Sequence, residues 1–337
     1  MKRLYIILSL SLFTLCGGLI YSSLESSSTV EANTKSAVKL GKAKRKHKVQ
    51  LPKMTFQMPR QEQLSPLTAR LLGFTGEKIL QRNDLVWNLK KEKLQKADFQ
   101  AILAFLKETP QKDGAHLGLH SLKNDLLTFI IEDGRFKDST ATLMLEIIND
   151  PDQHPVMREY VLQYIPDYFE KHWLNVKGAL REEKKLTGID LLFQETFIKS
   201  LWDISESTAD NGIAGTALVD LHELSSDFTK INLEQIAQRT ESLLDDSAMP
   251  DSSRMAAFSV ASERGLTHLF KKAEDVLFSE QEGIPLRLSA LHTASTMAPD
   301  QQFTEKLKKE FIENKQANRF LKRAAGIAIK KQQRDTK

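Results

Sequence analysis

The chain has 337 residues, of which 41% are apolar and 27% are charged, and its formal net charge is +4 at pH 7. This composition is typical of a globular chain and excludes one that is disordered throughout. A single cysteine excludes an internal disulfide and any zinc site built from a cysteine cluster. Glycine and proline are sparse for an all-β protein of this length, so the composition favours helices.

The N-terminal sequence predicts that the protein is targeted to a membrane. Lys2 and Arg3 precede an uncharged apolar run at residues 4–21, which is close to the shortest length that spans a bilayer. Residues 1–21 fit a signal-anchor or a signal peptide, and cleavage after residue 17 or residue 32 would make the protein secreted. We favour the uncleaved anchor, because the first site would leave an apolar new terminus and the second lies far beyond the apolar run.

The flanking charges predict which side of the membrane the body occupies. Lys2 and Arg3 lie directly against the apolar run, whereas the bases on its other side become dense only from about Lys39. Positive charge next to a membrane segment tends to stay in the cytoplasm. We therefore expect a membrane-anchored protein with its body outside the cytoplasm, in a bacterial periplasm or cell envelope.

A basic linker is predicted at residues 22–61, where Ser and Lys are frequent and apolar periodicity is missing. Residues 32–61 contain nine Lys or Arg and no acid, whereas residues 62–337 carry 37 bases and 42 acids. Such a segment could bind anionic lipid or a wall polymer. Its densest bases are Lys42, Lys44, Arg45, Lys46 and Lys48.

Helical periodicity continues from residue 62 to the end of the chain. Residues 62–97 are predicted to form N-terminal capping helices, and residues 98–337 to form an array of helix pairs. Basic residues open five similar segments, in which small or apolar residues follow at the third, fourth and seventh positions. These repeat anchors are Lys123, Arg158, Arg254, Arg287 and Lys322.

The anchor spacing predicts repeats. Successive anchors are 35, 96, 33 and 35 residues apart, and the long interval can hold one more pair plus an insertion near residues 171–186. A single helix pair cannot bury its own apolar side, so neighbouring pairs must stack. The pattern resembles the HEAT repeat family in Asp152–Arg158, Asp251–Arg254 and Ile284–Arg287, each of which opens a second helix.

This resemblance implies an all-α, right-handed α-solenoid of about six helix pairs over roughly residues 98–332, with an exposed face that binds protein. It also implies a ladder in which a loop Asp meets an Arg of a second helix. We expect Asp152 to serve Arg158, and Asp246 or Asp251 to serve Arg254.

A partner-binding surface is predicted where aromatic residues concentrate. Tyr160, Tyr164 and Tyr168 follow one another at helical spacing beside the insertion, and His172 and Trp173 come next. Tyrosine and tryptophan are enriched in binding surfaces because they offer large area at little cost in entropy. Packing of the tyrosines at an edge between repeats is the alternative.

The sequence predicts no metal site, catalytic site or cofactor. The pair His116 and His120 has metal-like spacing, but no further ligand lies close to it, and a solvent-facing loop is the simpler interpretation. No nucleophile motif, phosphate loop or dinucleotide fingerprint occurs, so no cofactor and no catalytic residue are expected. The acidic body argues against nucleic acid.

These features lead to one main hypothesis and two alternatives. The main one is a non-enzymatic scaffold, tethered to the membrane, that binds a protein partner of unknown identity. The first alternative makes the basic linker the principal binder of an anionic surface or polymer. The second is an enzyme with a HEAT-like fold, such as a bilin lyase or a DNA glycosylase, but neither family's catalytic residues can be placed in this sequence.

Overall fold

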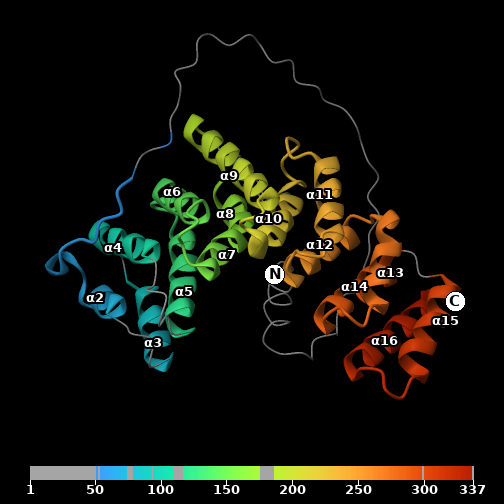
Figure 1. Cartoon of the computed structure of the whole chain (residues 1–337). Coiled ribbons are helices and arrows are strands. Elements are labelled where there is room, and N and C mark those ends of the chain that lie inside the picture. Colours follow the sequence, from blue (N-terminus) through green and yellow to red (C-terminus); the bar gives the residue numbers. More distant parts are fainter. Residues whose placement is uncertain are drawn as a thin grey trace, which may run out of the picture. The chain divides into compact units, whose positions relative to one another are not determined.

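The computed structural model consists of helices and their connections throughout its described part (Figure 1). The predicted all-helical body is confirmed for these residues. The structure describes residues 51, 54–73, 79–92, 94–108, 117–174, 186–297 and 300–335. The predicted membrane segment and the five dense bases of the linker lie outside them. No helix among the described residues is long and apolar enough to cross a bilayer.

Short helices come first. They are η1 (Gln61–Gln63), α2 (Pro66–Leu72) and α3 (Ile79–Leu89). Apart from Gln61, they lie within residues 62–97, where capping helices are predicted. α2 begins at Pro66 because Ser65 caps it, since the Ser65 side chain accepts a hydrogen bond from the Thr68 amide.

The remaining helices form successive pairs, each with a first and a second helix. The first three pairs are α4 (Lys96–Lys107) with α5 (Leu117–Asp133), α6 (Lys137–Ile148) with α7 (Pro155–Gln163) and its continuation α8 (Ile165–His172), and α9 (Gly188–Glu206) with α10 (Asn211–Leu224). The fourth pair is α11 (Leu233–Asp245) with α12 (Asp251–Glu263). In the last two pairs, η2 (Thr267–Leu269) and α13 (Phe270–Phe278) precede α14 (Ile284–Met297), and α15 (Gln301–Leu307) and η3 (Lys308–Glu313) precede α16 (Arg319–Asp335).

Consecutive second helices pack against one another along the chain. α5 contacts α7, α7 contacts α10, α10 contacts α12, α12 contacts α14, and α14 contacts α16. Every second helix also contacts the first helix of its own pair. Each of the five predicted anchors lies near the start of a second helix. The further pair expected in the long interval is α9 with α10.

The predicted tyrosine helix is interrupted. α7 ends at Gln163, and α8 begins at Ile165 with Pro166 in its first turn. Proline lacks the amide proton that a continuing helix would need, so the chain restarts at this point. α8 then ends at His172, and most of the predicted insertion lies outside the described residues.

Two second helices, α10 and α12, approach each other closely at Gly215 of α10. A Cβ added there would lie 2.5 Å from the Ser253 Cα and 2.8 Å from the Ala256 Cβ of α12. The Gly215 amide also donates to the Ser253 hydroxyl at 3.2 Å. The packing of α10 on α12 therefore requires a residue without a side chain at this position.

We expect Gly215→Ala to destabilise the fold by about 2 kcal/mol, because the methyl group overpacks the α10–α12 contact. Gly326→Ala in α16 is the matched control, since a Cβ there would meet only the Ile312 Cδ1, at 3.8 Å. The control should stabilise the protein by up to about 1 kcal/mol through helix propensity. Urea unfolding midpoints measure the change in stability of both variants. Equal shifts of the same sign would contradict the close α10–α12 contact at Gly215.

Candidate functional site

The anchors cap the helix that precedes them. Arg158 donates from Nε and Nη2 to the Ile148 carbonyl oxygen, at 3.0 and 2.7 Å, and Arg287 donates from Nε to the Leu277 carbonyl oxygen at 2.9 Å. Each carbonyl lies ten residues before its anchor, at the C-terminal end of the first helix. The last carbonyls of a helix lack partners within it and carry partial negative charge, so a base stabilises them.

Lys123 performs the same task without an acid. Its ammonium group donates to the Leu106 and Glu108 carbonyl oxygens, and its side chain is buried. Burial lowers the pKa of Lys123 to about 8, although the nearby Glu108 acts in the opposite direction. Lys322 is half-buried and forms no ion pair within the described residues.

Two anchors bind an acid from the following helix pair. Arg158 pairs with Asp210, which precedes α10, and Arg254 binds Glu282 through both terminal nitrogens, at 2.7 and 2.8 Å. The hydrogen bonds from Arg254 lower the pKa of Glu282, against the effect of its burial.

The expected acid partner of Arg158 was wrong in identity. Asp152 is exposed and forms no ion pair with Arg158, which pairs with Asp210 instead. The expected pair of Asp251 with Arg254 is confirmed at 3.9 Å, but Glu282 of the following pair lies closer to Arg254. Glu282 and Asp210 lie 28 and 52 residues after Arg254 and Arg158.

Tyr168 and Trp173 are wrong as partner-binding candidates because both side chains are buried. The Tyr168 hydroxyl donates to the Lys137 carbonyl oxygen at 2.6 Å, and burial raises the pKa of Tyr168. His172 is half-buried, and its Nε2 lies 3.0 Å from the Ile131 carbonyl oxygen. These side chains fill the junction between α8 and α9, with neighbouring rings at Phe169, Phe193, Phe197 and Phe228.

Asp190 links the polar groups of this junction. Its carboxylate accepts from the Lys137 ammonium at 2.6 Å, from the Trp173 indole at 3.0 Å, and from the Thr187 amide and hydroxyl at 2.8 and 2.7 Å. Burial raises the pKa of Asp190, but these hydrogen bonds outweigh it and lower the pKa to about 2. Sequence reasoning missed Asp190, although Thr187 three residues earlier is a capping-box signal.

Asp190→Asn should lower the free energy of unfolding at neutral pH by about 2 kcal/mol. Because the folded-state pKa lies below the ordinary value of 3.8, Asp190 stabilises the fold above about pH 4. That contribution is lost as the pH falls through about 2. Unfolding curves of both proteins should therefore differ at pH 7 and converge toward pH 2. Asp203→Asn, in an exposed ion pair on the same helix, is the control and should change little at any pH. A difference in unfolding free energy between the two proteins that stays constant at all pH values would contradict this role of the ionised Asp190 carboxylate.

Tyr160 and Tyr164 lie on the solvent side of α7. Both are half-buried, and the Thr128 hydroxyl of α5 donates to the Tyr164 hydroxyl at 2.8 Å. Burial raises the pKa of both tyrosines, and Asp125 adds to the effect on each. These tyrosines therefore sit in an acidic environment.

The same side of the next helices continues this surface. On α10, Asp220 is buried, and its pKa is raised by burial, by Glu223 and by Asp167 of α8. His222 Nε2 lies 3.2 Å from Glu263 Oε2 of α12. We call the solvent side of α5, α7, α8, α10, α12 and α14 the second-helix face. It carries acids and a half-buried tyrosine drawn from five helices, together with the half-buried Tyr164, which lies between α7 and α8. These residues are Asp125, Glu159, Tyr160, Tyr164, Asp167, Glu223 and Glu263.

The solvent-facing loop expected for His116 and His120 is wrong for His120, which lies in α5 and is buried, whereas His116 lies outside the described residues. His120 is buried beside the His154 ring, with the ring centroids 4.4 Å apart. Burial lowers the pKa of His120, and His154 and Lys123 add to this effect. Among the residues that the structure describes, no group of three or more His, Cys, Asp or Glu is placed to hold a metal ion.

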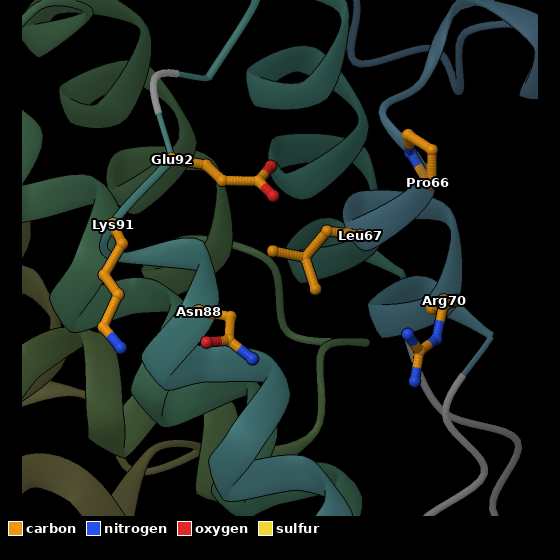
Figure 2. Close-up of a pocket in the computed structure, with 6 residues that line it drawn as sticks. All are labelled: Pro66, Leu67, Arg70, Asn88, Lys91 and Glu92. Atoms are coloured by element: carbon orange, nitrogen blue, oxygen red, sulfur yellow. The ribbon is translucent and has the colours of Figure 1, made fainter.

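A cavity of about 420 Å³ lies between α2 and the end of α3. Figure 2 shows Leu67 projecting from α2 toward the segment that carries Asn88 and Glu92. Its lining residues are Pro66, Leu67, Arg70, Asn88, Lys91 and Glu92. Arg70, Lys91 and Glu92 are the charged residues of this lining.

Comparison with known proteins gives no family for this chain. No family model matches the sequence, and neither a curated protein nor a solved structure is significantly similar to it.

Proposed function

We propose that the protein is a non-enzymatic scaffold of the cell envelope, tethered to a membrane by residues 4–21, that binds a protein partner on its second-helix face. The observation that carries the proposal is that the second helices of consecutive pairs contact one another. Tyrosines and acids from five of these helices lie on their partly exposed sides.

The contacts between successive pairs support an α-solenoid of the HEAT type. Arg158 and Arg254 each reach an acid of the following pair, which is the kind of ladder that the HEAT resemblance implies. In such proteins the stacked helices present an extended surface, and partners bind along it.

The charge of the face points to a basic partner. Asp125, Glu159 and Asp167 surround the two half-buried tyrosines. An aromatic ring beside carboxylates suits a Lys or Arg side chain, which gains both an ion pair and a cation–π contact. A partner segment rich in Lys or Arg is therefore the best complement to this part of the face.

The basic linker supports a second candidate function. Nine bases without an acid in residues 32–61 would attract an anionic lipid surface or a wall polymer, with strong salt dependence. The two functions are compatible, because the linker lies before the helical body in the chain.

We expect alkaline phosphatase fused after Lys337 to be active in cells, because this reporter needs disulfides that form only outside the cytoplasm. A β-galactosidase fusion at the same position is the matched control and should be inactive. Lys2→Glu with Arg3→Glu should lower the phosphatase signal, since it removes the charges that hold the N-terminus inside. The reverse pattern, with active β-galactosidase, would contradict the envelope location.

We expect a photoreactive benzoylphenylalanine at Tyr160 or at Thr296 to crosslink the same protein in cells. Both positions lie on second helices, Tyr160 on α7 and Thr296 on α14. The matched control is Leu233, an exposed apolar residue of the first helix α11. Adducts are compared on denaturing gels and identified by mass spectrometry. Equal yields of the same adduct from Leu233, or none from either test position, would contradict binding on the second-helix face.

A further inference from the structure

The outer side of α16 is a strip of basic side chains. The helix contains six bases and one acid, Asp335. At 100° per residue, Arg319, Arg323, Lys330 and Arg334 fall on one side of the helix, with Ile327 among them. Ile327 is 42% exposed, which is unusual for an isoleucine of this protein. We call these five residues the α16 strip.

The opposite side of α16 attaches the helix to the rest of the protein. Its buried residues are Leu321, Ala325, Ala328 and Ile329. They face α14, α15 and η3, which are the main contacts of this helix (Figure 1). The orientation of the strip is therefore fixed by packing, and its bases do not depend on a partner for their position.

The bases of the strip are unneutralised within the described residues. None of the four forms an ion pair there, and Arg319 only covers the Phe320 ring, 4.8 Å from its centroid. Some exposed bases elsewhere in the body are paired with acids, for example Lys199 with Asp203, Lys230 with Glu195 and Lys271 with Asp275. The strip is a concentration of positive charge on one side of one helix, with no ion pair among the described residues.

The shape of the strip identifies the kind of partner. From Arg319 to Arg334 it extends about 22 Å along one helix. A planar anionic surface can meet all four bases at once, and an exposed isoleucine between them can enter its headgroup region. An acidic peptide would have to match the spacing of the bases and would gain little from Ile327.

We propose that the α16 strip binds a membrane surface rich in anionic phospholipid headgroups, so that the body lies against a bilayer through its last helix. The proposal rests on the proposed membrane tether for the supply of a nearby bilayer, but the chemistry of the strip stands independently of it. This contact would fix the orientation of the second-helix face relative to the membrane.

The test uses the full chain held in nanodiscs of phosphatidylcholine, with Ile327→Cys in a Cys16→Ser background and an environment-sensitive fluorophore on the new thiol. Vesicles of phosphatidylcholine alone, or of equal parts phosphatidylcholine and phosphatidylglycerol, are then added. We expect a blue shift only with the anionic vesicles, and its midpoint should move to higher lipid concentration as salt is raised.

Removing the charge should weaken this binding strongly. Each base near an anionic surface contributes about a fivefold gain in partitioning, so Arg323→Gln, Lys330→Gln and Arg334→Gln together should raise the lipid midpoint about a hundredfold. Lys199→Gln, Lys230→Gln and Lys271→Gln together are the matched control, because they remove the same charge from exposed positions outside α16. Unchanged thermal melting of both triple variants shows that each is folded.

Three outcomes would overturn the proposal. They are no shift with anionic vesicles, equal weakening by both triple variants, and a shift with an oligoglutamate peptide at lower charge concentration than the vesicles require. The last would assign the strip to an acidic polypeptide. Co-elution of the chain with phosphatidylcholine nanodiscs is monitored separately, so failure of the tether is distinguished from failure of the strip.

Discussion

The structure depends on the burial of one side of each helix pair by the next pair. Leu218 and Leu221 of α10 and Ala257 and Phe258 of α12 are all buried, and these two helices pack against one another. Burying a side chain of this size stabilises a fold by about 1.5–3 kcal/mol for leucine or phenylalanine, and no single pair could bury its apolar side alone. A second helix has neighbours before and after it, so only one side of it stays in contact with solvent. That remaining side is where tyrosines and acids gather.

The sequence was informative about the pairs because their chemistry recurs at short range. A base that caps the preceding helix must lie near the start of a second helix, and the spacing of 33 to 35 residues between such bases reveals the period. Pro155 and Pro166 also mark helix starts, since proline is suited only to the first turn. These signals are local, and the structure agrees with them.

The acids of the following pair that meet Arg158 and Arg254 could not be assigned from the sequence, although Asp251, the nearby acid expected for Arg254, does lie 3.9 Å from it. Contacts with the following pair depend on packing between residues distant in the chain. The aromatic residues were misread for a related reason. Tyr160, Tyr164 and Tyr168 are evenly spaced, but the helix is interrupted between Gln163 and Ile165. Tyr168 is consequently buried, whereas Tyr160 remains half-exposed.

The junction between α8 and α9 explains why aromatic residues concentrate there. The second helices α7 and α10 contact each other here, and large aromatic rings fill the space beside them. Rings leave few polar contacts, so Asp190 supplies the hydrogen bonds that Trp173 and Lys137 need. A high local density of Tyr, Trp and Phe thus reflects internal packing here, with only Tyr160 and Tyr164 turned toward solvent.

The ladder of bases and acids gives the chain a direction. Arg158 relies on Asp210 and Arg254 on Glu282, so in each case the buried guanidinium belongs to the earlier pair and its counter-charge to the later one. Loss of a later pair leaves a buried cation without its acid, whereas loss of an earlier pair leaves only an acid near the surface. Because an uncompensated buried charge is far more costly than an exposed one, shortening from the C-terminal side damages the remaining pairs more than shortening from the N-terminal side. Growth of such a protein by duplication of a pair is correspondingly easiest when the new copy brings its own loop acid with it.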